Sequence, residues 1–465
     1  LTVNTTVNGG FTLTLNSTDA TTFAGIVGGS TALTGINTNA DGTVVFNTTA
    51  IETNGDQLYR ENATIGGNIT FTTGDNNLTF SGTVNSVSST KTLDIVAGSG
   101  DVTFSGTVGG SEALGNTTIG VAGLTAGAIK VQGTLAITNS ATSSITGIIS
   151  DGDSAAIITK AGSGTLTLSG DNTFTGAVTV NAGILSITHA DSLGTTDGAT
   201  TVASGAVLQI SNAINVADAI TISGTGISNN GAIRSTTGGN TLSGQITLAA
   251  HAEIQTDADT LTLNVSSGSA MTASNKNITF DGSGDITVAD PIATGSGTLT
   301  KSGSGTLTLS AANTYTGATT VSAGVLAISH ADSLGTTDGA TTVASGAALN
   351  ISGGITTAAE AITISGTGVS FRGAIRNTSG DNTYSGAITL GANTEIRSDS
   401  GTLTLNVASG SAIAASNKNL TFDGAGNITV ADPIATGSGT LSQTGNGTLT
   451  LSAANTYTGA TTISD

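Results

Sequence analysis

The feature that most constrains this chain is a long internal repeat. The segment HADSLGTTDGATTVASGA, His189–Ala206, returns letter for letter at His330–Ala347, so the offset between the copies is 330 − 189 = 141. The segment Ile286–Leu299 returns at Ile428–Leu441, where the offset is 428 − 286 = 142, so the second copy carries a one-residue insertion. A fixed period is typical of solenoids, propellers and other arrays, in which each unit buries its apolar face only against its neighbours. We therefore expect function to be distributed over a long surface.

Apolar residues alternate with polar residues along the whole chain. Pairs such as Ile69 with Phe71, at positions i and i+2, are typical of short strands with one buried face. Clusters of Gly, Asn, Asp and Ser lie between the pairs and favour tight corners. No segment shows a helical apolar period with capping residues, so the pattern predicts an all-β chain with almost no helix. The expected core ladder includes Leu166, Leu168, Val180, Ile187, Leu307, Leu309, Val321 and Ile328.

The spacing of these predicted strands favours one all-β architecture. No turn dipeptide such as Asn-Gly recurs between adjacent strands, which argues against a series of hairpins. A propeller needs a period of roughly 40 to 45 residues per blade, and the long repeat unit shows no threefold self-match. A parallel β-helix needs only three short strands in each coil of about 20 to 25 residues, with coils about 4.8 Å apart. We therefore predict a parallel β-helix, or β-solenoid, that forms a single elongated rod.

The repeat divides the chain into four parts. Residues 1–160 share the alternation but do not match the repeat, so we interpret them as divergent coils of the same rod. Residues 161–301 form the first repeat unit, residues 302–443 the second, and residues 444–465 the start of a third. Because neither end shows a closing cap, we expect the rod to continue beyond both, through a longer polypeptide or through end-to-end stacking of chains.

Composition excludes several kinds of partner. With 11 basic and 30 acidic residues the net charge is −19, so nucleic acids and anionic membrane surfaces would repel the chain. The absence of cysteine rules out disulfides and thiolate metal sites, and it suits a chain exported through an oxidising compartment. No apolar run reaches the roughly 18 residues of a membrane helix, and no signal pattern follows Leu1. We expect membrane association only through an anchor outside this chain.

Three segments share the pattern GTLTLS-x-x-NT-aromatic-TGA-x-T. They are Ala161–Ile187, Ser302–Ile328 and Thr444–Asp465. This pattern resembles the passenger-associated repeat of bacterial autotransporter adhesins, and the segment Ala32–Thr72 is similar to repeats of large filamentous-haemagglutinin-like exoproteins. The resemblance implies a right-handed parallel β-helix, export through the outer membrane, and an extracellular or cell-surface location as an adhesive or spacing stalk.

Two histidines are candidates for metal binding or catalysis because acidic residues follow them; these groups are His189 with Asp191 and Asp197, and His330 with Asp332 and Asp338. The two groups occupy equivalent places several coils apart, so one metal ion cannot contact both. Ser192 closely follows His189, but no orienting group or oxyanion donor accompanies this pair. We therefore expect exposed corner residues, and we predict no catalytic, cofactor-binding or metal-binding residues.

Two further sets of polar residues have structural explanations. The nine-residue calcium repeat is absent, so we interpret the aspartates of three Asp-Gly pairs as ordinary turn residues; they are Asp151, Asp281 and Asp423. The shared pattern also contains a repeated Asn, which we expect to satisfy backbone groups at an inner corner; its copies are Asn172, Asn313 and Asn455.

These observations favour a non-catalytic structural or adhesive surface fibre without a cofactor. Its expected partners are cell-surface or matrix receptors, glycans among them, and other copies of the chain, end to end or side by side. One alternative is a carbohydrate-active β-helix enzyme of the polysaccharide-lyase type, which would need aromatic platforms, whereas the chain has no Trp and 4 Tyr. Another is an ice-binding rod, because pairs such as Thr165 and Thr167 can form outward arrays; the irregular coil lengths predict a broken array.

Overall fold

In the computed structural model, which describes residues 1–464, the chain consists of short β-strands joined by turns. The helical content of these residues is two short 3-10 turns, η1 (Ile227–Asn229) and η2 (Val369–Phe371). Within this part of the chain, no helix has the length and apolar character needed to cross a membrane. Contacts divide the chain into two compact units, Leu1–Thr221 and Ile222–Asp465.

The N-terminal unit contains strands that range from very short to long, β18 being the longest. They are β1 (Thr2–Val3), β2 (Thr12–Leu15), β3 (Ala20–Phe23), β4 (Gly35–Thr38), β5 (Thr43–Phe46), β6 (Ala50–Glu52), β7 (Gln57–Tyr59), β8 (Asn62–Ile65), β9 (Ile69–Thr72), β10 (Leu78–Phe80), β11 (Val84–Ser86), β12 (Leu93–Val96), β13 (Val102–Phe104), β14 (Thr117–Val121), β15 (Leu124–Ala126), β16 (Ile129–Asn139), β17 (Ser143–Ile145), β18 (Ile149–Ala161), β19 (Thr165–Leu168), β20 (Val178–Val180), β21 (Gly183–Ile187), β22 (Thr200–Val202), β23 (Ala206–Ser211) and β24 (Asn215–Val216).

Strand β25 (Ile220–Gly224) includes the boundary between the units. The remaining strands, of the C-terminal unit, are β26 (Ile233–Thr237), β27 (Thr241–Leu242), β28 (Ile246–Thr256), β29 (Thr260–Leu263), β30 (Met271–Ala273), β31 (Ile278–Gly282), β32 (Asp285–Val288), β33 (Ile292–Ala293), β34 (Leu299–Lys301), β35 (Thr306–Leu309), β36 (Thr319–Val321), β37 (Val325–Ile328), β38 (Thr341–Val343), β39 (Ala348–Ile351), β40 (Ile362–Gly366), β41 (Ile375–Asn377), β42 (Asn382–Tyr384), β43 (Ile388–Ser398), β44 (Thr402–Leu405), β45 (Ile413–Ala414), β46 (Leu420–Asp423), β47 (Asn427–Val430), β48 (Ile434–Ala435), β49 (Leu441–Gln443), β50 (Leu449–Leu451) and β51 (Thr461–Ile463).

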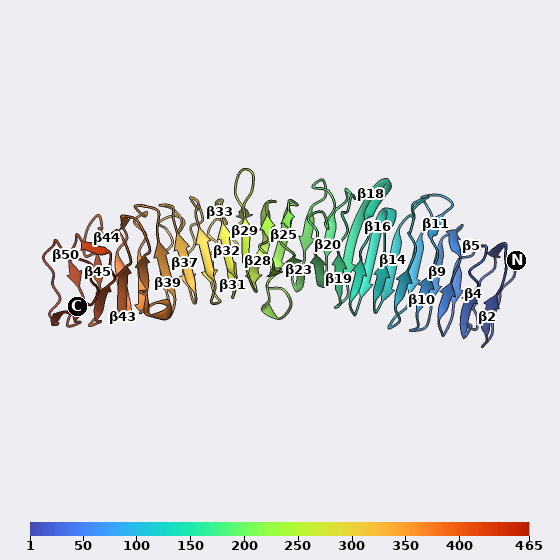
Figure 1. Ribbon diagram of the computed structural model, residues 1–465, viewed down its shortest axis with the longest axis horizontal. Helices are drawn as coiled ribbons and strands as arrows, with labels where there is room; N and C mark the ends of the chain where they lie inside the picture. Colours follow the sequence, from blue (N-terminus) through green and yellow to red (C-terminus); the bar gives the residue numbers. More distant parts are fainter. Residues whose placement is uncertain (465) are drawn as a thin grey trace. The chain divides into compact units, whose positions relative to one another are not determined.

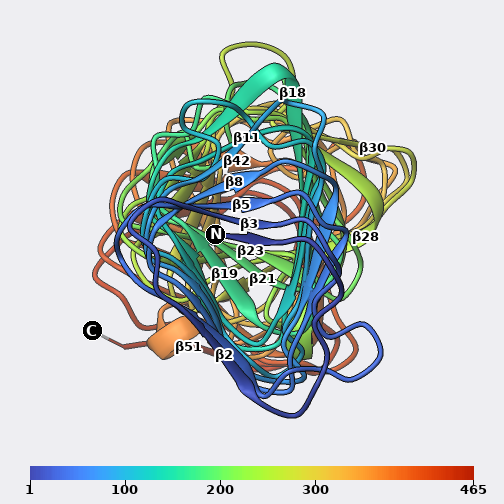
Figure 2. The same cartoon turned by 90° about the vertical axis from the view of Figure 1, so that its right-hand side faces the viewer.

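Strands of the N-terminal unit pair in parallel from one coil to the next (Figure 1). One ladder is β1-β3-β5-β8-β11, and Figure 2 shows several of its blue strands side by side. A second ladder includes β17, β19, β21 and β23, and a third includes β16, β18, β20 and β22. Leu166 pairs with Leu185 and Leu78 with Val102, so the length of a coil differs from place to place. This parallel arrangement confirms the predicted β-solenoid.

The core of the N-terminal unit changes character along the chain. Its first coils stack aromatic rings, and the rings of Phe23 and Phe46 are nearly parallel with their centres 5.5 Å apart. This aromatic group is buried and continues through Tyr59, Phe71, Phe80 and Phe104. Later coils use the predicted aliphatic ladder, in which Leu168 lies between Ile145 and Ile187 in register. The parallel register stacks like side chains, so burial is continuous through neighbouring coils.

The C-terminal unit repeats this aliphatic core. Leu307 pairs with Ile286 on one side and Leu326 on the other. All eight residues predicted for the core ladder, in both units, are at most 1 % exposed. Strand β43 pairs with β40 through its first half and with β41 through its second, so one long strand lines two faces of its coil. The alternation of the sequence thus supplies the inward side chains, and the outward residues of the same strands remain free for function.

Candidate functional site

The two predicted histidines lie at turns that follow equivalent strands. After β21, the side chain of His189 is 42 % exposed, and its Nδ1 accepts a hydrogen bond from the Asp191 backbone N–H at 3.2 Å. After β37, His330 is 43 % exposed and forms the same bond with Asp332 at 3.1 Å. Both are corner residues, as predicted.

The serine beside each histidine is a backbone cap. Ser192 is fully buried, and its hydroxyl donates to the Leu168 carbonyl at 2.9 Å while it accepts from the His189 backbone N–H at 3.1 Å. Ser333 forms the equivalent bonds in the second repeat. Because the hydroxyl donates to a backbone carbonyl, it does not donate to the imidazole as the hydroxyl of a serine–histidine nucleophile pair would.

Asp171, which was not predicted to belong to this group, lies beside His189 and Asp191. Ligand atoms of Asp171, His189 and Asp191 lie within 4.8 Å of one another, which is the spacing of a candidate metal site. Asp171 comes from the preceding coil, so its place beside His189 depends on the coil register and cannot be recognised from the sequence alone. The equivalent residue of the second repeat is Ala312, so the grouping is not repeated.

The repeated asparagine fastens adjacent coils, as predicted. Asn172 is 2 % exposed; its Oδ1 accepts from the Ile149 backbone N–H at 2.7 Å, and its Nδ2 donates to the Ser192 carbonyl at 2.7 Å. Asn313 forms the same pair of bonds, and Asn455 Oδ1 accepts from the Ile434 N–H at 2.8 Å. A buried backbone donor without such a partner would be costly.

The aspartates of the Asp-Gly pairs have protein partners. Asp151 accepts from the Ala156 backbone N–H at 2.7 Å and from the Thr175 hydroxyl at 2.7 Å. Asp281 Oδ1 accepts from the N–H of the next residue, Gly282, at 2.6 Å, and Asp423 pairs with Arg397. The prediction that these aspartates are turn residues is wrong, because Asp151 lies in β18, Asp281 in β31 and Asp423 at the end of β46. Their carboxylates bond to backbone and side-chain groups of the same and neighbouring coils.

The outward threonines form rows of different lengths. One row of the C-terminal unit is continuous in register over six strands, and its members are Thr279, Thr300, Thr320, Thr342, Thr363 and Thr389, whereas other rows are interrupted. In the C-terminal unit Thr262, Thr287 and Thr308 follow one another in register, but the next partner is Ala327. In the N-terminal unit Thr165 pairs with Ile184. The break predicted for the threonine array is therefore present in these two rows and absent from the row of six threonines, which ends where Thr389 pairs with Ala414.

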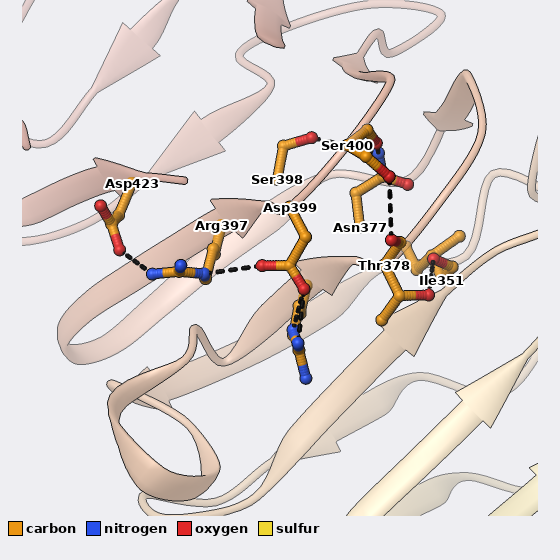
Figure 3. Close-up of polar contacts among 9 residues, drawn as sticks. Ile351, Asn377, Thr378, Arg397, Ser398, Asp399, Ser400 and Asp423 are labelled. Atoms are coloured by element: carbon orange, nitrogen blue, oxygen red, sulfur yellow. Dashed lines mark hydrogen bonds and ion pairs between the residues drawn. The ribbon is translucent and has the colours of Figure 1, made fainter. Parts of the chain in front are cut away.

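A charged group on the C-terminal unit lies along one outward row. Asn350, Arg376, Arg397 and Asp423 are neighbours in register on β39, β41, β43 and β46. Arg376 Nε and Arg397 Nε each donate to the Asp399 carboxylate at 2.7 Å, and Arg397 also pairs with Asp423. Figure 3 shows the Arg397 guanidinium between the two carboxylates. This continuous ion network joins successive coils.

This group cannot be recognised from the sequence alone, although the sequence carries one sign of it. Three of the five arginines of the chain, Arg372, Arg376 and Arg397, lie close together in the sequence. The sequence does not show that Arg376 and Arg397 lie on one face. They belong to strands of different coils, and the register of these coils makes them neighbours. The first repeat keeps Arg234 paired with Asp257 but has Gln255 in place of the second network arginine.

Several acidic groups near these rows have shifted pKa values. Burial would raise the pKa of Asp399, but the hydrogen bonds from Arg376 and Arg397 outweigh it and hold the pKa below its usual value. Burial, together with Asp423, raises the pKa of Glu395 to about 7 despite the opposing charge of Arg397. Burial and Asp281 raise the pKa of Glu253 to about 7 in the first repeat. These two glutamates are therefore partly protonated near neutral pH.

Two lysines are buried at an equivalent corner. Lys160 Nζ donates to the carbonyls of Ala161, Gly162 and Ala182, and Lys301 forms the equivalent bonds in the next copy. Burial lowers the pKa of each lysine to about 8. The third copy has Gln443 there, whose amide donates to two loop carbonyls. The shared task of these side chains is to satisfy carbonyl groups, so they are structural.

Comparison with known proteins assigns the three similar segments. The family described as the passenger-associated transport repeat matches residues 158–187, 299–328 and 441–465. No curated protein and no solved structure matches the chain. The match confirms the resemblance to the passenger domains of autotransporters, and that family implies a secreted or cell-surface protein.

Proposed function

We propose that this chain is a non-catalytic surface fibre, the β-helical part of an autotransporter-like passenger that adheres to other surfaces or holds a binding region away from the cell. The observation that carries the proposal is the combination of a parallel β-solenoid with three passenger-associated transport repeats. In such a stack each coil contacts its neighbours alone, so length and exposed surface grow together without a central cavity.

The side chains best suited to chemistry support a structural role. Ser192 and Asn172 are bonded to the backbone of neighbouring coils, and Arg376 and Arg397 are bonded to carboxylates. A polysaccharide lyase would need a basic group and a general base acting together in a cleft, and the four side chains named here are engaged with protein groups instead. In a fibre, these bonded side chains have a structural role, because they connect neighbouring coils.

Adhesion is tested with beads coated with the purified chain. Coated beads should bind to host-like cells or extracellular matrix more than beads coated with an unrelated acidic β-solenoid of similar charge. Equal binding of both bead types would contradict the adhesive part of the proposal and leave a spacing role.

The non-catalytic part has its own test. We expect incubation with a panel of acidic and neutral polysaccharides to release neither reducing ends nor unsaturated products. Reproducible turnover, lost when a single acidic or basic residue is changed, would support the lyase alternative instead.

A further inference from the structure

A short loop of the second repeat presents an aromatic side chain to solvent. Phe371 lies at the end of η2, and it is 80 % exposed with a backbone φ of 58°. Bulky residues rarely adopt this left-handed conformation because Cβ crowds the backbone. A strained and exposed aromatic residue indicates a functional demand, since neither packing nor backbone preference favours it.

The equivalent loop of the first repeat shows that its fold does not require the aromatic residue. There Asn229 adopts the same φ of 58° and Asn230 follows it, in place of Phe371 and Arg372. The Asn229 side chain accepts a hydrogen bond from the Thr225 hydroxyl at 2.8 Å within the loop. The same backbone hydrogen bond closes both loops at 2.9 Å. The second copy has therefore replaced a side chain that suits the loop with one that does not.

A pocket of about 230 Å³ lies beside this loop. Its polar lining includes Asn350, Ser370, Arg372 and Arg376. Asn350 Oδ1 is buried and accepts no hydrogen bond from residues 1–464, although Asn350 lies next to Arg376 in register. A buried acceptor without a donor is costly, so rotation of the Asn350 side chain toward the pocket, where a ligand hydroxyl donates to it, would relieve the cost.

The charge of the pocket favours an anion. Arg376 is neutralised by Asp399, whereas Arg372 is exposed and forms no ion pair with the described residues. A guanidinium in this state is suited to bidentate contact with a carboxylate. In a chain of net charge −19, an unpaired arginine beside an exposed aromatic ring is a local exception.

The geometry points to a binding site for a carboxylate-bearing saccharide at this pocket. The sugar carboxylate pairs with Arg372, a ring hydroxyl donates to Asn350 Oδ1, and the apolar face of the sugar ring packs on Phe371, whose ring offers a large flat surface. This inference rests on the proposed adhesive function and deepens it by naming the ligand class, and it places the site on the second repeat alone.

The test compares the full chain with variants that copy the first repeat. The probes are 3′-sialyllactose with lactose as its neutral partner, and an oligogalacturonate with its methyl ester, with binding measured by titration calorimetry or ligand-observed NMR. The wild type should bind at least one acidic probe at least tenfold more tightly than its neutral partner, and which pair shows this identifies the sugar. The double variant Phe371→Asn with Arg372→Asn should lose at least tenfold in affinity, and Asn350→Gln should weaken binding as well.

Matched controls separate binding from folding. The double variant installs the residues of a loop that this chain already forms, so its circular dichroism and melting curve should match the wild type. The variant Asn229→Ala with Asn230→Ala should leave saccharide binding unchanged.

Several results would overturn the inference. They are equal binding of acidic and neutral probes, no binding of any probe, and unchanged affinity in the double variant. Binding of polyglutamate without saccharide binding would overturn it too, in favour of an acidic peptide. If coated beads still adhere when they carry the double variant, this pocket is not the site of adhesion. The proposed adhesive function would then stand without it.

Discussion

At the scale of single residues, stability comes from inward side chains and from polar groups that fasten one coil to the next. Leu168 and Asn172 show the two roles within one turn of the chain: the first fills the core, and the second satisfies backbone groups of adjacent coils. Buried acidic groups oppose this stability when they ionise, because burial disfavours charge.

Shortening a core side chain should have a local effect. Leu168→Ala removes a fully buried side chain that lies between Ile145 and Ile187, and it should cost roughly 2 to 5 kcal/mol of local stability. Hydrogen exchange should show lost protection in the neighbouring coils and normal protection several coils away, because contacts are between neighbours. Uniform loss of protection along the N-terminal unit would refute this expectation.

A buried glutamate predicts how stability depends on pH. Glu360 is 2 % exposed, and burial raises its pKa from 4.5 to about 7 despite the hydrogen bond from the Thr341 hydroxyl. The folded state therefore binds more protons than the unfolded state between these two values, so stability falls as pH rises from about 4.5 to 7 and then levels off. The share of Glu360 in this fall is at most about 3 kcal/mol.

Thermal unfolding of Glu360→Gln tests whether ionisation of Glu360 lowers stability as pH rises. The variant should lose part of the fall between pH 5 and pH 8, while Glu253, Glu395 and Asp218, whose pKa values burial also raises, retain the rest. A variant with the same pH profile as the wild type would show that Glu360 is not the titrating group.

At the scale of strands and coils, the register decides which outward residues meet. The sequence predicted the strands, the parallel pairing, the core ladder and the inward Asn corner, because all of these follow from alternation and from the repeated pattern. It did not predict the row Asn350, Arg376, Arg397 and Asp423 or the grouping of Asp171 with His189. These depend on coil lengths that vary from place to place, and alternation does not fix such lengths.

The arginine row should contribute little to stability. Arg397→Gln copies the first repeat, where Gln255 stands, and it should cost less than about 1 kcal/mol because the ion pairs are partly exposed. Urea unfolding at low and high salt should show the difference shrinking with added salt.

The reverse change provides the matched control for this prediction. Gln255→Arg, beside Asp257 and Asp281, should be neutral or slightly stabilising. A fall in the free energy of unfolding of well over about 1 kcal/mol in Arg397→Gln, with no dependence on salt, would contradict the prediction. That result would show that the ion network is a main source of stability for its coils.

At the scale of the whole molecule, stacked coils carry the passenger-associated transport repeat in both units. In this stack the buried apolar core is the same from one repeat to the next, whereas the outward surface differs between copies. The second repeat differs from the first at Phe371, Arg372 and Arg397 while their cores match. Repetition therefore maintains the fold, and we expect divergence between copies to supply specific binding.

The most direct test of the central claim is where the chain is found in the cells that produce it. Antibodies raised against the purified chain are applied to intact cells and to cell lysates, before and after treatment of intact cells with proteinase K, with a cytosolic protein as the control for lysis. We predict that intact cells or their culture medium carry the chain, and that protease removes the cell-bound label while the cytosolic control survives. Label found only after lysis, and protected from protease in intact cells, would contradict the surface-fibre account.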